Sequence, residues 1–431
     1  MSREKRKTRD KFSPWYLSTA EDTEDTEDDH ERPQAFPSVS SVSSVVGRFR
    51  HVKKIRVGVI YGGRSGEHEV SLASAAAVFQ NLDPERYEAI AIRIEKDGRW
   101  ALPAEPPKMM KAADTIAGSR GAPLRASEAD TREAHLVAHP GGDTLLTIDR
   151  HSSQASVSGL GLDVVFPVLH GPYGEDGTVQ GLLELANVPY VGAGVLASSV
   201  GMDKAAMKLV FAAKGLPIGD YEVVLKRDWQ RDERAIMNAV VNQLGFPVFV
   251  KPANLGSSVG ISKAKHATEL RTAINLAAEF DRKIVIEAAV PQAREIECAV
   301  LGNDEPEASV PGEIIPGREF YDYEAKYLDD SSRTVIPASL TDRQAEEVRR
   351  LAIAAFKAID CAGMARVDFL LGGDSGVLYL NEVNTIPGFT TISMYSKMWE
   401  ASGLPYPKLI DRLIALAIER HHDKQQLRTS M

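Results

Sequence analysis

Three oxygen-bearing side chains occur close together in the last quarter of the sequence. Asp368 lies in the apolar run "VDFLL", and Glu382 and Asn384 lie in "VLYLNEVN". If both runs are strands of one hairpin, the two-residue alternation of side chains places all three on one face. Three oxygen ligands without cysteine or histidine suit a hard cation, most simply magnesium held jointly with nucleotide phosphates. A solvated polar face is the alternative, and the apolar neighbours of these residues argue against it.

The same two runs set the expected register of the hairpin. A turn centred near Asp374 would place Asp368 opposite Leu380 and Arg366 opposite Glu382. Arg366 beside these carboxylates fits two interpretations. It could form a structural ion pair, or it could act as a planar bidentate donor that neutralises a developing anion. The sequence leaves both interpretations open.

A glycine- and serine-rich loop forms a second candidate site. The loop "NLGSSVG" (254–260) joins two β-rich runs, and Lys251 comes just before it. Glycines permit a close approach of the backbone, and successive amides and hydroxyls can surround a phosphate. The Walker A pattern is absent, and an ordinary flexible hairpin is the alternative for this loop. On their own, Lys204 and Lys326 would be interpreted as surface charges. They become candidate phosphate-binding residues only because the chain also contains this loop.

Two acidic residues and a histidine follow a glycine-rich turn near residue 65. Glu67, His68 and Glu69 in "GGRSGEHEVS" directly follow the apolar run "IRVGVIY". The amino-terminal end of a helix favours anions, so Glu67 would stay ionised and ready to bind an ammonium group. The alternative is that these residues only cap and charge the first helical turn. His170, in "LHGPYG", would on its own be read as a loop histidine.

The elements that must position these residues follow from hydrophobic periodicity. "KIRVGVIYGG" and "LDVVFPVLHG" are predicted buried strands, each followed by a glycine loop and a helical pattern. Repeated strand–loop–helix units predict a parallel sheet whose carboxyl-end loops gather the ligand. Between them, residues 101–160 are expected to be an irregular insertion, with a hairpin turning at Gly141–Gly142.

The second half of the chain predicts antiparallel α+β units. A helix begins near Asp203, and "FPVFVKP", "KIVIEAAV" and "EIECAVLG" surround a helix near 267–280 in one small unit. The last third holds the hairpin and helices near 340–359 and 407–420.

Composition limits the class of protein. The chain has 431 residues, 43% of them hydrophobic and 26% charged, which is typical of a soluble globular protein. A net charge of -9 argues mildly against nucleic acid as a partner. No apolar run is long enough for a membrane span, and the two cysteines are expected to be buried free thiols, as in the cytoplasm. Residues 1–52 are acidic and serine-rich and are expected to be a disordered tail.

Taken in order, the motifs resemble those of one family. They are "GGRSGEHEVSL", "LHGPYGEDGTVQGLLE", "GMDK", "VKPANLGSSVGISK", "EIECAVLG", "FYDYEAKY", "ARVDFLL" and "NEVNTIPGFT". This series resembles D-alanine–D-alanine ligases of the ATP-grasp superfamily, from about residue 54 to 420, outside the tail and the 101–160 insertion. The resemblance implies a multi-domain α/β fold with an N-terminal parallel-sheet domain and a two-part ATP-grasp fold (α+β). The expected boundaries are 53–196, 197–310 and 311–421, with tails at 1–52 and 422–431.

The activity implied by the resemblance is a condensation driven by ATP. Two D-alanines would be joined through a D-alanyl phosphate to give D-alanyl-D-alanine, ADP and phosphate for peptidoglycan precursors. ATP would be a substrate, and two Mg²⁺ or Mn²⁺ ions would bind Asp368, Glu382 and Asn384, with Glu382 bridging. The family also suggests a cytoplasmic homodimer, with neither nucleic acid nor a membrane as a partner.

The resemblance also implies a set of nucleotide-binding residues. Lys204, Lys251 and Lys326 would bind ATP, and the amides and hydroxyls of Ser257 and Ser258 would close over its phosphates. The remaining contacts fall on the base and the ribose: Glu287 at the adenine amino group, the backbone of Ala288, Ala289 and Val290 along the base, Phe320 packed on it, and Glu295 at the ribose. Relatives often have a bulky residue where this chain has "AAV", so the base pocket is expected to be looser.

The remaining implied roles concern the amino-acid substrates. Glu67 would receive the ammonium of the first D-alanine and His170 would approach its carboxylate, while Arg366 and the Gly388 amide would stabilise the tetrahedral oxyanion. Tyr327 would link by hydrogen bonds to Ser257 and Glu67, a tyrosine that relatives using D-lactate lack. Ser393 would hold the second carboxylate, although "TTISMY" departs from the commoner pattern of the family.

Two alternatives to this function remain. The first is a D-alanine–D-lactate ligase or another ATP-grasp carboxylate–amine ligase. The second belongs to another class, a nucleotide-binding sensor that has lost catalysis. The presence of Arg366, Glu67 and the three cation ligands argues against the sensor.

Overall fold

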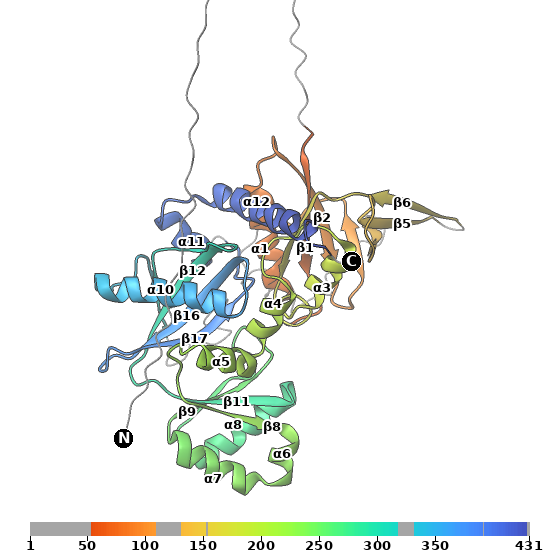
Figure 1. The fold of residues 1–431 in the computed structure, drawn as a ribbon. Coiled ribbons are helices and arrows are strands. Elements are labelled where there is room, and N and C mark those ends of the chain that lie inside the picture. Colours follow the sequence, from red (N-terminus) through yellow and green to blue (C-terminus); the bar gives the residue numbers. More distant parts are fainter. Residues whose placement is uncertain (1–52, 109–130, 152–153, 318–331, 391, 429–431) are drawn as a thin grey trace, which may run out of the picture. The chain divides into compact units, whose positions relative to one another are not determined.

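The computed structural model describes residues 53–108, 131–151, 154–317, 332–390 and 392–428. The described chain forms three sheets with helices packed against them (Figure 1).

The first sheet has seven strands in the order β6-β5-β4-β3-β2-β1-β7. Its strands are β1 (Ile55–Gly62), β2 (Tyr87–Ile94), β3 (Trp100–Pro103), β4 (Thr131–Leu136), β5 (Leu145–His151), β6 (Gln154–Leu160) and β7 (Val164–Leu169). β1 pairs in parallel with β2 and β7, as the strand–loop–helix pattern predicts. Helices α1 (His68–Asn81) and α3 (Thr178–Ala186) follow β1 and β7. The loops after β1 and β7 therefore leave the same edge of the sheet.

The segment 101–160 is not irregular where the structure describes it. Strands β3 to β6 extend the first sheet by successive antiparallel pairing. The hairpin at Gly141–Gly142 is confirmed, because Leu136 pairs with Leu145 across it. These strands at the end of the sheet carry many polar residues, so their apolar pattern is weak. A weak pattern is the reason that the sequence predicted only the hairpin at Gly141–Gly142 and not the remaining strands of this segment.

The second sheet is small and antiparallel, in the order β10-β9-β11-β8. Its elements are β8 (Tyr221–Leu225), α6 (Lys226–Arg231), α7 (Glu233–Leu244), β9 (Val248–Pro252), β10 (Ser262–Ala264), α8 (Ala267–Phe280) and β11 (Lys283–Ala288). A hydrophobic cluster of its own, including Trp229, Leu270 and Ile286, lies between the sheet and its helices. Helices α4 (Val195–Met202) and α5 (Lys204–Ala213) precede this sheet in the chain, and their residues Ala197, Met207 and Phe211 pack in the hydrophobic cluster of the third sheet. The Asp203 side chain caps α5 by accepting from the amides of Ala205 and Ala206.

The third sheet has the order β15-β14-β12-β16-β17, with β13 paired to β12. Its elements are β12 (Arg294–Gly302), β13 (Glu307–Ala308), β14 (Gly312–Ile315), β15 (Arg333–Val335), α10 (Asp342–Ala358), β16 (Gly363–Leu371), β17 (Leu378–Asn384), α11 (Met394–Ala401) and α12 (Tyr406–Gln425). The run "EIECAVLG" was expected in the second unit, and this expectation is wrong. It forms β12, which pairs along its whole length with β16.

The predicted register of the β16–β17 hairpin also needs correction. Asp368 pairs with Glu382 rather than Leu380, and Arg366 pairs with Asn384 rather than Glu382. The register shifts between Asp368 and Phe369, as it does where a β-bulge inserts one residue into a strand. The alternation nevertheless leaves Asp368, Glu382 and Asn384 on one face, as predicted, and it brings the two carboxylates directly opposite each other.

The first and third sheets share one hydrophobic core. Val59 of β1 and Phe166 of β7 belong to the same buried cluster as Phe389 and as Leu413 of α12. The rings of Phe166 and Phe389 meet edge to face at 5.7 Å. Tyr87 of β2 donates a hydrogen bond of 2.9 Å to Asp411 of α12. The cluster of the second sheet is separate from this one.

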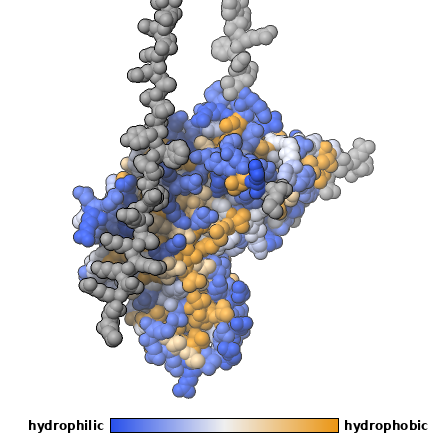
Figure 2. All heavy atoms as spheres, viewed as in Figure 1, coloured by the Kyte–Doolittle hydropathy of each residue, from blue (hydrophilic) through white to orange (hydrophobic). Residues whose placement is uncertain are grey.

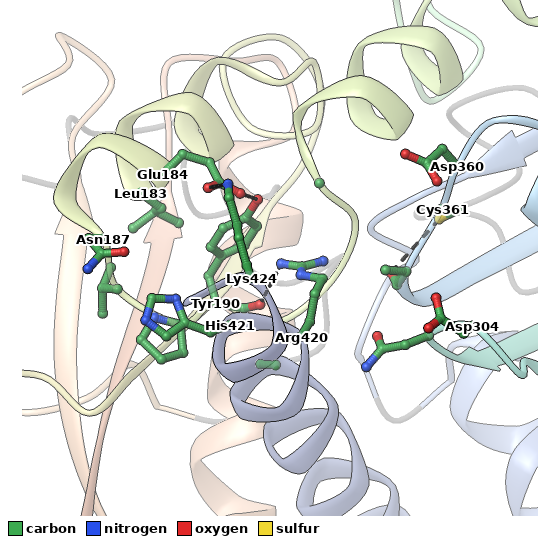
Figure 3. Close-up of a pocket in the computed structure, with 16 residues that line it drawn as sticks. Leu183, Glu184, Asn187, Tyr190, Asp304, Asp360, Cys361, Arg420, His421 and Lys424 are labelled. Atoms are coloured by element: carbon green, nitrogen blue, oxygen red, sulfur yellow. Dashed lines mark hydrogen bonds and ion pairs between the residues drawn. The ribbon is translucent and has the colours of Figure 1, made fainter. Parts of the chain in front are cut away.

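Arg420 ties α12 to the chain that follows β7 (Figure 3). Its guanidinium donates to the carbonyl oxygens of Gly192 and Tyr190 and stacks on the Tyr190 ring at 4.5 Å. Lys424 forms an ion pair with Glu184 of α3. These residues line a cavity of about 260 Å³ that lies apart from the residues predicted to carry chemistry.

The face shown in Figure 2 is largely polar, with apolar residues gathered in a band that runs down to the lower part of the molecule. The exposed large apolar side chains of the described residues include Leu185 of α3, Leu196 of α4, Leu209 of α5 and Val223 of β8. None of the described helices combines the length and the apolar character that a membrane span requires.

We expect Arg420→Ala to lower the free energy of unfolding by about 2 kcal/mol, because two carbonyl groups lose a charged donor and the Tyr190 ring loses its cation. Urea unfolding monitored by circular dichroism measures this change. Lys424→Ala is the matched control on the same helix. Its ion pair is more than half exposed on the lysine side, at 57%, so we expect a loss below about 1 kcal/mol. Equal losses in the two variants would contradict the assigned role of Arg420.

Candidate active site

Glu67 and Ser257 bring the first and second units together. Glu67 occupies the N-cap position of α1 and is buried. The Ser257 hydroxyl, in the glycine-rich loop that follows β9, donates a hydrogen bond to Glu67 Oε1. Asn254 anchors the start of that loop through its amide and its side chain, which donate to Asp281 Oδ2 at 2.8 and 3.0 Å. The loop predicted to bind phosphate therefore lies against the carboxylate predicted to bind ammonium.

A second buried carboxyl group lies beside Glu67. Glu175 Oε1 accepts a hydrogen bond of 2.7 Å from the Gly171 amide. A Cβ atom on Gly256 would lie 2.9 Å from Glu67 Oε2 and 3.6 Å from Glu175 Oε1, so a larger residue here would displace the Glu67 carboxylate. Burial and the negative charge of Glu67 raise the pKa of Glu175 to about 8. One of the two carboxyl groups is therefore protonated at neutral pH, which limits their mutual repulsion.

His170 lies inside the same region and contacts α1. Its Nε2 is 3.3 Å from the Ser74 hydroxyl, and that hydroxyl oxygen accepts a hydrogen bond of 3.3 Å from the Phe389 amide. Burial lowers the pKa of His170 to about 4, so the imidazole is neutral at pH 7. Ser74 thus connects the loop after β7 with the residue that follows Gly388. A Cβ on Gly388 would lie 3.0 Å from the Ser393 hydroxyl, which places these two predicted residues side by side.

Three buried lysines contact the glycine-rich loop and Glu287. Lys204, the first residue of α5, donates a hydrogen bond of 2.6 Å from Nζ to the Leu255 carbonyl in the glycine-rich loop. Lys251 donates one of 2.7 Å to Glu287 Oε2, and Lys208 Nζ lies 3.1 Å from Glu287 Oε1. Burial alone would raise the pKa of Glu287, but the ammonium groups of Lys208 and Lys251 lower it to about 2. Glu287 is therefore a fixed anion.

The backbone after Glu287 is held by hydrogen bonds to neighbouring loops. The amide of Ala288 donates to the Asp220 carbonyl and that of Ala289 to the Pro247 carbonyl, both at 3.0 Å. Glu295 lies on β12, opposite Leu370 of β16. The backbone of this segment is thus fixed before any ligand binds.

The third sheet contributes the carboxylate face. Arg366 donates two hydrogen bonds, of 2.7 and 2.6 Å, to the carboxylate of Asp368, and its Nε lies 3.3 Å from Glu297 Oε2. Burial lowers the pKa of Lys251, but the negative charges of Glu287 and then of Glu382 raise it. Burial and the charge of Glu67 are the main causes that raise the pKa of Glu175, and the charge of Glu382 adds to them, so Glu382 lies within electrostatic range of both other units. Charged groups from all three sheets therefore interact with one another.

The donor set of this face fits a hard divalent cation. Asp368 and Glu382 face each other across the hairpin, and Asn384 shares their face. Among the described residues, no group of three or more histidines, cysteines, aspartates and glutamates is arranged to hold a metal without other ligands. Two carboxylates and one amide therefore need further oxygen ligands, such as those of a phosphate.

Three predicted residues, Phe320, Lys326 and Tyr327, lie outside the described residues. The remaining predicted residues lie on the elements that surround the cleft. Sequence reasoning missed Glu175, Lys208, Ser74 and Glu297. Helical spacing could have identified Lys208 as a candidate, because it follows Lys204 by four residues and so shares its helix face. The other three carried no signal of their own, since buried serines and glutamates resemble surface residues in a sequence.

Models of two protein-domain families match this chain. The model described as "D-ala D-ala ligase N-terminus" matches residues 56–193, and that described as "D-ala D-ala ligase C-terminus" matches residues 210–415. The D-alanine–D-alanine ligase of Geobacillus thermodenitrificans is 48% identical over 374 residues, which cover 87% of this chain and 98% of the relative. That of a Thermoanaerobacter species is 50% identical over 374 residues, covering 86% of this chain and 99% of the relative.

Solved structures are similar over the same range. The D-alanine–D-alanine ligase from Coxiella burnetii superposes with a TM-score of 0.72 at 38% identity, covering 86% of this chain and 96% of that one. The VanG D-Ala:D-Ser ligase from Enterococcus faecalis gives a TM-score of 0.72 at 33% identity, covering 85% and 100%.

His170 predicts a specific pH dependence of stability. The pKa of its side chain is lowered from 6.5 to about 4 in the folded protein. As pH falls from 7 to 5, the unfolded chain binds a proton that the folded chain does not, so stability is lost. We expect the free energy of unfolding of the wild type to fall by about 2 kcal/mol more than that of His170→Gln over this interval.

Urea unfolding at pH 5, 6 and 7 without ligands measures this difference. His139→Gln, in the exposed loop between β4 and β5, is the control for replacing a histidine. Parallel pH curves for the wild type and His170→Gln would show that the imidazole is not held neutral.

Proposed function

This chain belongs to the D-alanine–D-alanine ligase family, and from this premise we propose how its cleft performs an ATP-dependent ligation of two D-alanines. The hydrogen bond from Ser257 to Glu67 carries the proposal, because it joins the glycine-rich loop to the N-terminal substrate loop. D-alanine and ATP are the substrates of such a ligase. The roles of individual residues below are part of the proposal.

The first D-alanine binds at the end of the first sheet. Its ammonium group pairs with the carboxylate of Glu67, which is ionised while the neighbouring Glu175 holds a proton. Its carboxylate approaches His170, whose position is supported by Ser74. A small zwitterion thus spans a negative and a neutral polar group, and its carboxylate oxygens point toward the glycine-rich loop.

ATP binds between the second and third sheets. Lys204 and Lys251 contact its phosphates, and the amides and hydroxyls of Ser257 and Ser258 close over them. The base lies along Ala288, Ala289 and Val290 with its amino group at Glu287, and Glu295 binds the ribose. Backbone amides already engaged at Ala288 and Ala289 support a pre-formed base pocket.

The reaction proceeds in two steps because a carboxylate is a poor electrophile. The carboxylate oxygen of the first D-alanine attacks the γ-phosphorus, the bond from this phosphorus to the bridging oxygen of ADP breaks, and a D-alanyl phosphate forms. When bound, divalent cations at Asp368, Glu382 and Asn384 supply positive charge to the phosphoryl oxygens. Lys204 and Lys251 add charge from the other side, so that positioning and electrostatics lower the barrier.

The second step forms the peptide bond. The amine of the second D-alanine attacks the acyl carbon, and the carbonyl oxygen becomes an oxyanion. Arg366 and the Gly388 amide stabilise this oxyanion. The attacking nitrogen then gives up one proton, the acyl–oxygen bond breaks, and the leaving group departs with that proton as hydrogen phosphate. One such donor is typically worth about 3 kcal/mol. Ser393, beside Gly388, holds the carboxylate of the second substrate.

The second substrate distinguishes members of this family. VanG is a D-Ala:D-Ser ligase, and relatives that use D-lactate lack the tyrosine that stands here as Tyr327. Its presence favours an amine nucleophile, and we propose D-alanine at both sites. We also propose a cytoplasmic location, which the free thiols of Cys298 and Cys361 and the use of ATP support. A homodimer is proposed from the resemblance to the family alone.

We propose three domains along the chain. They are those expected at 53–196, 197–310 and 311–421, except that β12 joins the third because it pairs with β16. The pairing moves the second boundary to the segment between β11 and β12.

The decisive experiment measures phosphate release with ATP, magnesium and a panel of D-alanine, D-serine, D-lactate and L-alanine. We expect D-alanine alone to give full turnover and D-alanyl-D-alanine as the product identified by mass spectrometry. Trapping with hydroxylamine should yield the D-alanyl hydroxamate. ATP binding without phosphate release at saturating D-alanine would favour the sensor, and a preference for D-alanine with D-lactate would favour the depsipeptide ligase.

We expect Arg366→Lys to lower kcat by about 100-fold, because a lysine keeps the charge but loses the bidentate fork. The KM for ATP should change by less than about threefold, since Arg366 acts on the acyl group in this mechanism. Arg343→Lys, on the exposed side of α10, is the matched control. An unchanged kcat in Arg366→Lys would restrict Arg366 to a structural ion pair with Asp368 and Glu297.

A further inference from the structure

Lys208 belongs to a buried ion cluster around Glu287 that extends beyond the predicted nucleotide contacts. Its Nζ lies 3.1 Å from Glu287 Oε1, and both side chains are buried, with exposed fractions of 3% and 9%. Lys251 donates a hydrogen bond of 2.7 Å to the other oxygen, Oε2. The carboxylate of Glu287 is thus held from two sides by lysines that come from different elements.

The elements around the cluster fix this geometry. Glu287 is the fifth residue of β11 and lies opposite Phe249 of β9, so Lys251 is its diagonal neighbour on the same face. Lys208 comes from α5, one turn after Lys204, and its Nζ lies 5.7 Å from the centroid of the Tyr221 ring. One helix face thereby directs Lys204 to the glycine-rich loop and Lys208 to Glu287.

We propose that Lys208 is a positioning residue that holds Glu287 ionised and oriented, so that this carboxylate selects a purine with an amino group at position 6. This inference rests on the proposed function, in which Glu287 faces the base. An ionised carboxylate only accepts hydrogen bonds, so it receives an amino group and repels a 6-oxo group. A protonated or reoriented carboxyl group can donate to a 6-oxo group and loses this selectivity.

Lys208 is needed in addition to Lys251 to keep Glu287 ionised, because the two lysines have different roles. In the proposed function Lys251 also binds phosphates, so its positive charge is shared with the nucleotide. Lys208 lies on the opposite side of the carboxylate and is committed to Glu287. A buried carboxylate without a dedicated cation would take up a proton instead, because burial disfavours its charged form.

The test compares ATP with inosine triphosphate, which carries a 6-oxo group, in the wild type and in Lys208→Met. We expect the wild type to prefer ATP by about 100-fold or more in kcat/KM, because a site built around one hydrogen bond rejects the analogue that reverses it. In Lys208→Met this preference should fall by about tenfold, mainly through a higher KM for ATP, with the KM for D-alanine unchanged. Lys214→Met, exposed at the end of the same helix, is the matched control.

A double-mutant cycle separates positioning from a purely structural role. Glu287→Gln should lose most of the base preference, since an amide can both donate and accept. If Lys208 acts through Glu287, adding Lys208→Met to Glu287→Gln changes the preference no further. A structural role alone would lower the thermal stability of Lys208→Met and leave the ratio between the two nucleotides unchanged, which would overturn the proposal.

The effect of a substitution on folding and its effect on base preference are measured in separate experiments. If Lys208→Met does not fold, Lys208→Gln takes its place with the same expectation, and the double variant removes both buried charges together. Competition of ATP and inosine triphosphate for a fluorescent ATP analogue, measured without D-alanine, reports base preference independently of ligation. A wild type that prefers ATP in this binding assay but makes no dipeptide would refute the proposed reaction and retain the role of Lys208. Equal binding of the two nucleotides by the wild type would refute that role.

Discussion

Burial of carboxylates, each held by a specific hydrogen-bond donor, is the constraint on which this structure depends. Glu67, Glu287 and Asp368 come from different sheets, and each is buried or half-buried next to a specific donor. A buried charge without a partner costs several kcal/mol, so the donors must be placed to within a fraction of an ångström. The same arrangement leaves both signs of charge available in the cleft, as a zwitterion and a polyphosphate require.

The hydrophobic cores explain how that accuracy is reached. The first and third sheets share one core, so the carboxylate of Glu67 and the face of Asp368 belong to a single rigid frame. The second sheet has a core of its own and contacts this frame through the loop after β9, whereas Met207 and Phe211 of α5 pack in the core of the third sheet. Loop contacts cost less to break than a packed core does, so the second sheet with α6 to α8 is the part that moves most readily when substrates enter.

Much of this arrangement could be predicted from local sequence, because hydrophobic period and turn residues act over short distances. The strand before Glu67, the helix over residues 267–280 and the shared face of Asp368, Glu382 and Asn384 all follow from such patterns. The partner of β12 could not be predicted, because strand pairing depends on distant parts of the chain. The bulge beside Asp368 shifts the register without a glycine or proline to reveal it. The pairing of Lys208 with Glu287 could not be predicted, because the two residues are remote in sequence.

The shared core also determines when the first sheet can be fully covered while the chain is being synthesised. Val59 and Phe166 lie in the first half of the chain, but the side chains that cover them include Phe389 and Leu413 near its other end. While the ribosome is still making the middle of the protein, α1 covers part of this apolar surface through Ala75 and Val78, but the part that Phe389 and α12 bury stays exposed. The core is completed only after α12 has been made, and apolar surface that stays exposed until then favours aggregation.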